Sequence, residues 1–185
     1  MSHPSVARRI AYRRRRAGVV CLALAVLVAA GYWRNRSRDR APEALSEATY
    51  RVERVVDGDT LLLANRARVR LQGVDTPETV KPNHPVEPFG PEASEFTRQF
   101  VAQAGGAVRL QFDRERIDKY GRHLAYVWAG ERMLNEELVR EGLATAETGF
   151  RYSQSMKTRF RRAEDEARAA RRGIWSPEAE PAGNL

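Results

Sequence analysis

The stretch at residues 54–78 constrains the fold more than any other part of this chain. A strand-like segment at 50–56 leads into Asp57-Gly58, a dipeptide typical of tight turns between antiparallel strands, and a second strand-like segment follows at 60–64. From 66 to 72, arginines and Gln72 alternate with apolar residues, which is the period of a strand with one buried face. The stretch therefore predicts three short strands, the third of which presents a row of arginines.

The remaining patterns predict one inserted helix, two further strands and two trailing helices. The inserted helix opens at Pro91 and ends at Gly105-Gly106. The other elements are strands at 108–112 and 124–128 and helices at 133–141 and 153–172, with an irregular stretch at 143–152. The order predicts an α+β, predominantly β fold, namely a five-stranded oligonucleotide-binding (OB) barrel with about three attached helices. Four aromatic residues are expected in its core: Phe96, Phe100, Trp128 and Trp175.

Asp57, Asp59 and Asp75 stand at the ends of apolar runs, so at least some of them are expected to meet at one rim of the sheet. Carboxylates brought together repel one another and are tolerated when a cation holds them. Arginines beside such a cation suggest a phosphate ligand. The stretch is therefore interpreted as a site for a hard metal ion and a phosphate.

Each of these features also has a simpler interpretation. Asp57-Gly58-Asp59 alone is a hairpin turn, and Arg66 and Arg68 fit an ordinary solvated strand face. His84 and His123 have no partner at metal-ligand spacing and are expected at the surface. The solvated face of the last predicted helix accounts for Lys157, Arg159, Arg161 and Arg162, with contact to a nucleic-acid backbone as the alternative.

The positive charge of the chain is confined to its N-terminal arm. The formal net charge is +8, but residues 1–40 hold ten arginines against Asp39, a net of +9. The remaining 22 basic and 23 acidic residues give residues 41–185 a net charge of −1. A polyanion is therefore expected to be held by local arginines and a metal ion, because the field of the whole domain does not attract it.

The N-terminal residues predict export or membrane anchoring. A basic arm at 1–16 precedes an apolar run at 17–33, which as a helix spans about 25 Å, at the short end for a bilayer crossing. The run is interpreted as a transmembrane anchor, as a cleaved signal peptide or as a soluble buried helix. The first two interpretations agree that residues 41 onward are exported: the domain is either anchored at the membrane, or secreted or periplasmic after signal cleavage. The run also contains Cys21, the only cysteine, so the globular part has no disulfide or cysteine-based zinc site.

A polar tether is predicted at 34–48, the globular domain at 49–176 and a flexible tail at 177–185.

Three separated motifs occur in order: VVDGDT at 55–60, VRLQGVDTPE at 69–78 and DKYGR at 118–122. Together with FGPEASEFT at 89–97, LNEELVREGLA at 134–144 and GIW at 173–175, they resemble the staphylococcal nuclease, or thermonuclease, family. The resemblance runs from about residue 50 to residue 175.

This resemblance implies a role for each matching residue. It makes Asp59 and Asp75 carboxylate ligands of a calcium ion, with Thr76 offering its backbone carbonyl and Asp57 contacting the ion through water or supporting its ligands. It makes Glu78 the general base that activates a water molecule. The phosphate-binding arginines would be Arg70 and Arg122, and the positions flanking the nucleotide phosphate would be Lys119 and Tyr120.

The chain departs from the family where two tyrosines would line the nucleotide pocket. It has Thr148 and Phe150 there, with Tyr152 nearby. Phe150 retains an aromatic face on which a base stacks, but the missing hydroxyls change the expected base preference and affinity.

The resemblance implies a calcium-dependent phosphodiesterase that cuts DNA and RNA with little sequence preference and leaves a 3′-phosphate and a 5′-hydroxyl. A monomer is expected, with the membrane as a partner if the N-terminal helix stays uncleaved. Two alternatives are a non-catalytic OB-fold module that binds nucleic acid at a membrane, and a membrane-tethered domain that binds a protein. The full set of Asp59, Asp75, Glu78, Arg70 and Arg122 favours the enzyme, because a binding module has no need to keep these residues together.

Overall fold

The computed structural model describes residues 42–79 and 87–179. In these residues no helix is both long enough and apolar enough to span a bilayer. The basic arm at 1–16, the predicted anchor or signal segment at 17–33, most of the tether and His84 lie outside the described residues.

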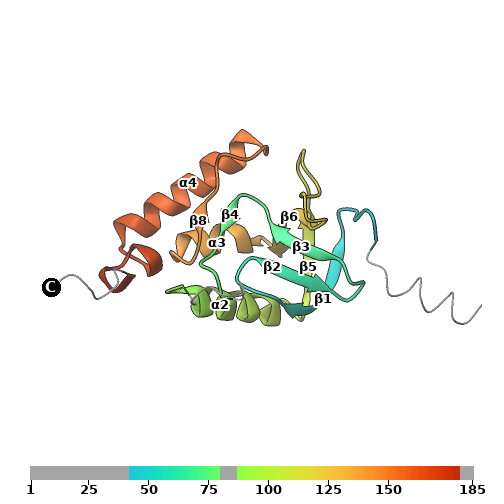
Figure 1. Cartoon of the computed structure of the whole chain (residues 1–185), viewed down its shortest axis with the longest axis horizontal. Helices are drawn as coiled ribbons and strands as arrows, with labels where there is room; N and C mark the ends of the chain where they lie inside the picture. Colours follow the sequence, from blue (N-terminus) through green and yellow to red (C-terminus); the bar gives the residue numbers. More distant parts are fainter. Residues whose placement is uncertain (1–41, 80–86, 180–185) are drawn as a thin grey trace, which may run out of the picture. The chain divides into compact units, whose positions relative to one another are not determined.

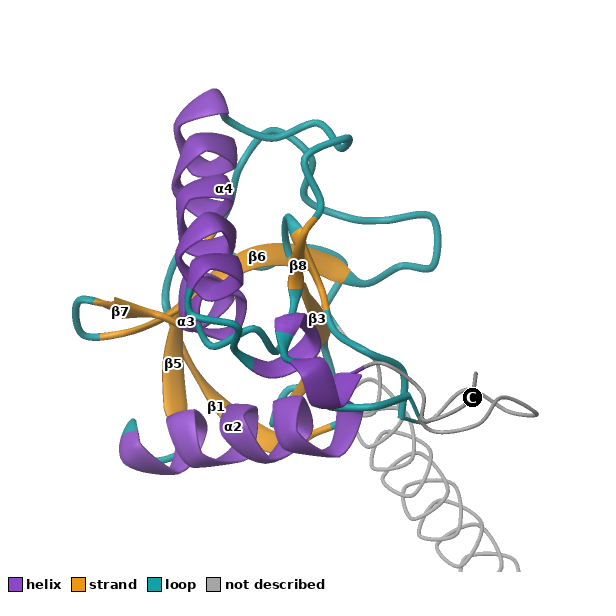
Figure 2. Ribbon diagram, turned by 90° about the vertical axis from the view of Figure 1, so that its left-hand side faces the viewer, coloured by secondary structure: helices purple, strands orange, loops and turns teal. Residues whose placement is uncertain are grey.

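Five strands form a closed barrel (Figures 1 and 2). They are β1 (Thr49–Val55), β2 (Thr60–Leu63), β3 (Arg68–Leu71), β5 (Ala107–Gln111) and β6 (His123–Ala129). The antiparallel pairs run in the order β3-β2-β1-β5-β6, and a parallel pairing of β3 with β6 closes the ring. This topology confirms the predicted five-stranded OB barrel.

The first strand, β1, pairs with two other strands along its length. Its first residues, from Thr49 to Arg51, pair with β5, and the residues from Val52 to Val55 pair with β2. The register of the second pairing shifts between Val52 and Arg54. Such an irregularity bends a strand and increases its twist, which a small barrel needs in order to close.

Three α-helices are attached to the barrel within the described residues, as predicted. They are α2 (Gly90–Gln103), α3 (Leu134–Arg140) and α4 (Gln154–Ala169). The helix α2 packs against β1 and α3, and α3 packs against α4 and β6 (Figure 2). The short strand β7 (Arg132–Met133) pairs with β6, and the 3₁₀ helices η1 (Gly173–Trp175) and η2 (Pro177–Ala179) follow α4.

The core fills the barrel with alternate residues of its strands. The apolar side chains that are buried there include Leu61, Leu63, Val69, Leu71, Val108, Leu110, Ala125 and Val127. Phe100 of α2 joins this core as predicted.

Phe96 and Trp128, also expected in the core, are partly buried and pack against it, whereas Trp175 is only partly buried and does not belong to this cluster. Two of them are covered by arginines. The guanidiniums of Arg109 and Arg159 lie 5.1 and 5.4 Å from the Trp128 ring, and that of Arg168 lies 3.6 Å from the Trp175 ring. A guanidinium on the ring face covers an indole while keeping its own charge close to water.

The globular domain begins before the predicted boundary at residue 49. Leu45 is buried in the core, and its carbonyl accepts a hydrogen bond of 2.8 Å from Arg116 Nη2. His123, expected at the surface, is only 4% exposed, and its Nε2 lies 3.3 Å from the Pro42 carbonyl. Both differences have one cause: the buried Leu45 side chain and the backbone carbonyls of Pro42, Leu45 and Ala48 attach the segment at 42–48 to the barrel, although most of its side chains are exposed.

A small two-stranded ladder was not predicted. The strands β4 (Val74–Asp75) and β8 (Thr145–Ala146) pair antiparallel, and the Glu147 amide donates to the Gly73 carbonyl at 2.9 Å. Gly73 has a φ of 77°, and a Cβ there would lie 2.7 Å from Cζ of Tyr152, so glycine is required. The ladder ties the segment that carries Asp75 to the segment that leads to Phe150.

Candidate active site

The turn between β1 and β2 brings Asp57 and Asp59 to the rim of the barrel. The Asp59 amide donates to Asp57 Oδ1 at 3.1 Å, and the Gly58 carbonyl accepts a bond of 2.6 Å from Thr97 Oγ1 of α2. A Cβ at Gly58 would lie 2.8 Å from Thr76 Oγ1 and 2.9 Å from the Ala93 Cβ. Only glycine therefore lets the turn pack against α2 and the segment after β4.

Asp59 is the most enclosed of the predicted metal ligands. Its carboxylate is buried, and Oδ2 accepts hydrogen bonds from the Thr76 amide at 3.0 Å and from Thr76 Oγ1 at 2.9 Å. Oδ1 accepts from Thr60 Oγ1 at 3.1 Å. These donors satisfy a buried charge and fix Thr76, the third predicted ligand, beside it.

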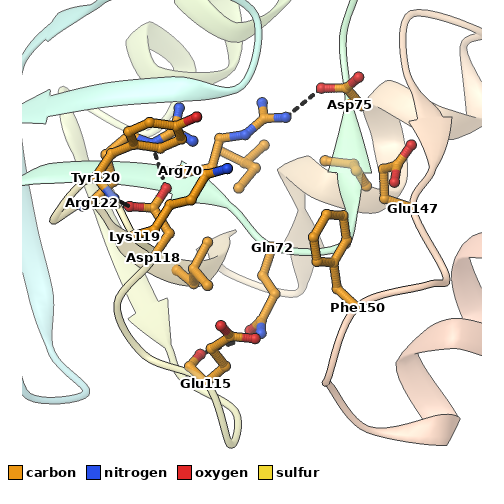
Figure 3. A pocket seen from close by; sticks show the side chains of 14 residues that line it. Arg70, Gln72, Asp75, Glu115, Asp118, Lys119, Tyr120, Arg122, Glu147 and Phe150 are labelled. Carbon is orange, nitrogen blue, oxygen red and sulfur yellow. Dashed lines mark hydrogen bonds and ion pairs between the residues drawn. The ribbon is translucent and has the colours of Figure 1, made fainter.

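Arg70 joins the two predicted carboxylate ligands. Its Nη1 forms an ion pair with Asp59, and its Nη2 forms an ion pair and a hydrogen bond with Asp75 (Figure 3 shows the latter). The Arg70 side chain is 16% exposed. Burial lowers the pKa of Arg70, and the neighbouring Asp75 carboxylate counteracts that effect.

Four acidic residues share one small pocket with two arginines. The pocket has a volume of about 120 Å³, and we call it the cation pocket; its lining residues are Asp57, Asp59, Arg70, Asp75, Thr76, Pro77, Glu78 and Arg122. Burial, with a smaller contribution from the charge of Glu78, raises the pKa of Asp57. The structure therefore brings together all of the residues predicted to bind metal or to act in catalysis.

The acids do not gather into a tight cluster, however. Across residues 42–79 and 87–179, no three histidine, cysteine or acidic side chains form a group that could hold a metal ion. The chemistry of the donor set still fits calcium, because carboxylate and backbone carbonyl oxygens are its usual ligands. Asp59 and Asp75 are close enough to bind one guanidinium, so one cationic group already satisfies both carboxylates.

Glu78 is held by two hydrogen bonds with Glu87, a residue that the sequence analysis did not identify. The Glu78 amide donates to Glu87 Oε2 at 2.9 Å, and the Glu87 amide donates to the Glu78 carbonyl at 3.0 Å. The Thr79 amide donates to Glu78 Oε1 at 3.1 Å. Glu87 thus positions the predicted base by holding the main chain of Glu78. Neither composition nor residue spacing indicates this role.

Arg122 reaches the cation pocket from the loop between β5 and β6, where Asp118 holds it. Asp118 Oδ2 accepts from Arg122 Nε at 2.7 Å, and Oδ1 accepts from the amides of Tyr120 and Arg122 at 2.8 and 2.9 Å. Burial opposes the charge of Asp118, but these hydrogen bonds outweigh it and lower the pKa of the carboxyl. Sequence reasoning missed this role, although the motif carries a turn signal, an aspartate three residues before Gly121.

A larger pocket of about 480 Å³ adjoins the cation pocket and shares Arg70, Asp75 and Arg122 with it (Figure 3). Tyr120 and Phe150 line it on opposite sides and are 72% and 60% exposed. We call it the aromatic pocket. Lys119 also lines it, with Nζ 5.0 Å from the Tyr120 ring. The three residues predicted to bind substrate therefore share one pocket, next to the predicted phosphate arginines.

Other residues of the aromatic pocket were not predicted. They include Gln72, Glu115 and Glu147. The Gln72 side chain donates from Nε2 to the Glu115 carbonyl at 3.3 Å, while its buried Oε1 has no hydrogen-bond partner among the described residues. These residues come from a strand end and two loops, and only the folded barrel brings them together.

The fold and the two pockets define a class: an OB barrel that carries acids, arginines and exposed aromatic rings at one rim, suited to a phosphate-containing ligand. The family model described as staphylococcal nuclease homologue matches residues 68–177. The chain belongs to the staphylococcal nuclease family.

Several proteins named as nucleases are similar over most of the chain. A thermonuclease of Staphylococcus hyicus is 40% identical over 163 residues, which is 86% of this chain and 92% of the relative. A thermonuclease of Staphylococcus intermedius is 42% identical over 168 residues, 85% of this chain and 95% of the relative. The endonuclease YncB of Bacillus subtilis (strain 168) is 39% identical over 129 residues, 68% of this chain and 60% of the relative.

Proposed function

We propose that this protein is a calcium-dependent endonuclease that hydrolyses DNA and RNA with low sequence specificity and leaves 3′-phosphate and 5′-hydroxyl ends. The nuclease class follows from the family and from relatives named thermonuclease and endonuclease. The observation that carries the finer proposal is the cation pocket, in which two arginines, two mutually close aspartates and Glu78 line one small volume.

The metal-binding residues are assigned by their donor chemistry and by resemblance. Asp59, Asp75 and the Thr76 carbonyl would hold calcium, and Asp57 would contact it through water. When bound, calcium would neutralise charge on the phosphate and make the phosphorus easier to attack.

The catalytic residues act on the scissile phosphodiester. Arg70 and Arg122 each present a planar fork of N–H donors to the phosphoryl oxygens, where negative charge grows in the transition state. Glu78 accepts a proton from the attacking water as the water oxygen bonds to phosphorus and the bond from phosphorus to the 5′ oxygen breaks. The 5′ oxygen takes a proton from solvent water and leaves as a hydroxyl, and Glu78 then releases its proton to solvent. The phosphate stays on the 3′ oxygen.

Low sequence specificity fits the aromatic pocket. Tyr120 and Phe150 offer ring faces, and stacking on a ring face accepts any base because every base has a π-face. Lys119 adds a point charge close to Tyr120 for the adjoining phosphate.

The N-terminal arrangement completes the proposal. We infer a basic arm at 1–16, an anchor or signal segment at 17–33 and an exported nuclease domain, either membrane-anchored or secreted. Sequencing the N-terminus of the mature protein from fractionated cells distinguishes the two forms: a start near Gly31 rules out the anchor, and an intact N-terminus in the membrane fraction rules out the cleaved signal. Recovery of the intact chain from the soluble interior of the cell would overturn the export itself.

The enzyme is tested by cleavage of end-labelled single-stranded DNA and RNA by the full-length chain, in calcium and in chelator. The wild type is compared with Glu78→Gln and with the control Glu53→Gln, whose carboxylate pairs with Arg66 at the surface. We expect cleavage in calcium only, 3′-phosphate products, a loss of at least about 10²-fold for Glu78→Gln and no loss for the control. A folded wild type that binds nucleic acid but cleaves none under any condition would contradict the proposal.

A further inference from the structure

A third cavity continues the line of pockets beyond Phe150. It has a volume of about 680 Å³ and is lined by Arg114, Glu115, Gly149, Phe150, Arg151, Tyr152 and Lys157; we call it the flanking groove. Glu115 and Phe150 also line the aromatic pocket (Figure 3), which in turn shares Arg70, Asp75 and Arg122 with the cation pocket. The three cavities therefore adjoin one another in the order cation pocket, aromatic pocket and flanking groove, with Phe150 lining both of the last two.

The flanking groove is basic, although the domain that contains it has a slightly negative net charge. It contains Arg114, Arg151 and Lys157 against the single carboxylate of Glu115, whereas residues 41–185 carry a net charge of −1. None of these three cations forms an ion pair with another residue that the structure describes, while Arg70, Arg122, Arg140 and Arg159 all do. Cations that are grouped, unpaired and next to a polyanion-binding site are placed to hold phosphate.

The walls of the groove are joined by one carboxylate. Asp113 Oδ2 accepts from the Ser153 amide and from the Tyr126 hydroxyl, each at 2.8 Å, and Oδ1 accepts from the Arg114 amide at 2.8 Å. The loop that carries Arg114 and the segment that carries Arg151 are thus fastened to each other. Lys157 forms a cation–π contact with Tyr152, in which its Nζ lies 5.1 Å from the centre of the ring. These contacts hold the walls of the groove in place.

We propose that the flanking groove binds the phosphodiester backbone of the nucleotides next to the one held in the aromatic pocket, with the Phe150 ring between the two sites. The inference rests on the proposed nuclease function and extends it: the enzyme binds more than one nucleotide of a single-stranded substrate at a time. Polynucleotides are then better substrates than dinucleotides, because only a longer strand places phosphates against Arg114, Arg151 and Lys157.

The test measures the salt dependence of binding, which counts phosphate contacts. For single strands the slope of log Kobs against log[salt] changes by about 0.7 for each phosphate contact. The full-length chain binds a 12-nucleotide single strand in chelator, where no cleavage is expected. We expect the variant Arg114→Gln/Arg151→Gln/Lys157→Gln to bind more weakly, with a slope shallower by up to about 2. We expect Arg151→Gln alone to make the slope shallower by about 0.7.

The matched control is Arg68→Gln, which removes one charge from an exposed position on β3 that lines none of the three cavities. We expect it to keep the wild-type slope. In calcium, the triple variant should lose kcat/KM on the 12-nucleotide strand but keep it on a dinucleotide. An unchanged slope in both groove variants, or an equal loss on the two substrates, would overturn the groove. If the wild type cleaves neither substrate, the nuclease proposal fails, while the binding slopes still decide whether the groove holds phosphates.

Discussion

Arg68 and Arg70 lie two residues apart on β3, on the strand face opposite the buried Val69 and Leu71. Arg68 is exposed, whereas Arg70 is largely enclosed and bridges Asp59 and Asp75. The same residue type on the same face is thus a solvated charge in one place and a site residue in the other. Position relative to the rim of the barrel decides which.

Asp118 illustrates a residue that acts through another. It binds Arg122 Nε and two backbone amides of the loop, so we expect Asp118→Asn to leave Arg122 present but poorly placed. Small misplacements of a catalytic group cost up to about 10²-fold, and we expect a loss of about 10- to 100-fold in kcat/KM. Steady-state kinetics on single-stranded DNA measure this loss, with Asp165→Asn, an exposed position on α4, as control. Equal activity of the two variants would show that Arg122 does not need Asp118.

At the level of elements, the site is assembled from segments that are distant in sequence. The β1–β2 turn, the segment after β4 and the β5–β6 loop supply the cation pocket, and the segment after β8 adds Phe150. The β4–β8 ladder and Asp113 hold these segments together. The precision of the site therefore depends on links between loops as much as on the barrel.

Asp113 provides a pH-dependent test of these links. Burial opposes its charge, but hydrogen bonds from the amides of Ser153 and Arg114 and from the Tyr126 hydroxyl lower the pKa of Asp113 below 3.8. A lowered folded-state pKa gives stability that is present above the unfolded pKa and lost as the pH falls through the folded one. We expect Asp113→Asn to lower the free energy of unfolding by about 1.5 to 3 kcal/mol at neutral pH, because hydrogen bonds to a charged group are lost.

The measurement is urea unfolding of wild type and Asp113→Asn at neutral pH and again well below pH 3.8. The difference between the two proteins should be largest at neutral pH and shrink toward zero in acid. A difference that stays the same at both pH values would mean that the charge of Asp113 contributes nothing to stability.

Most elements could be predicted from the sequence, because alternating or helical periods fix them locally. The β4–β8 ladder could not, since two residues are too short to show a period, and the strands are 70 residues apart in the sequence. The burial of His123 depends on residues 42–48 folding back onto the barrel, which polar composition does not reveal. In the site, the motifs identified acids and arginines, but not Glu87 or Gln72, whose contacts arise only from tertiary structure.

At the scale of the whole molecule, charge is divided between two parts of the chain. Residues 1–40 carry a net charge of +9, and residues 41–185 carry −1. Without a basic surface over the whole domain, capture of a polyanion depends on local cations in the connected cavities. This division explains why single arginines are expected to have large effects on activity.

The most direct test of the account compares Arg70→Lys with Arg68→Lys in single-turnover cleavage of single-stranded DNA in calcium. Both variants keep the positive charge, but lysine lacks the planar fork that binds two phosphate oxygens at once. We predict a loss of about 10²-fold or more for Arg70→Lys and wild-type rates for Arg68→Lys, with both proteins folded. Equal cleavage rates for the two variants would contradict the assignment of the cation pocket as the active site.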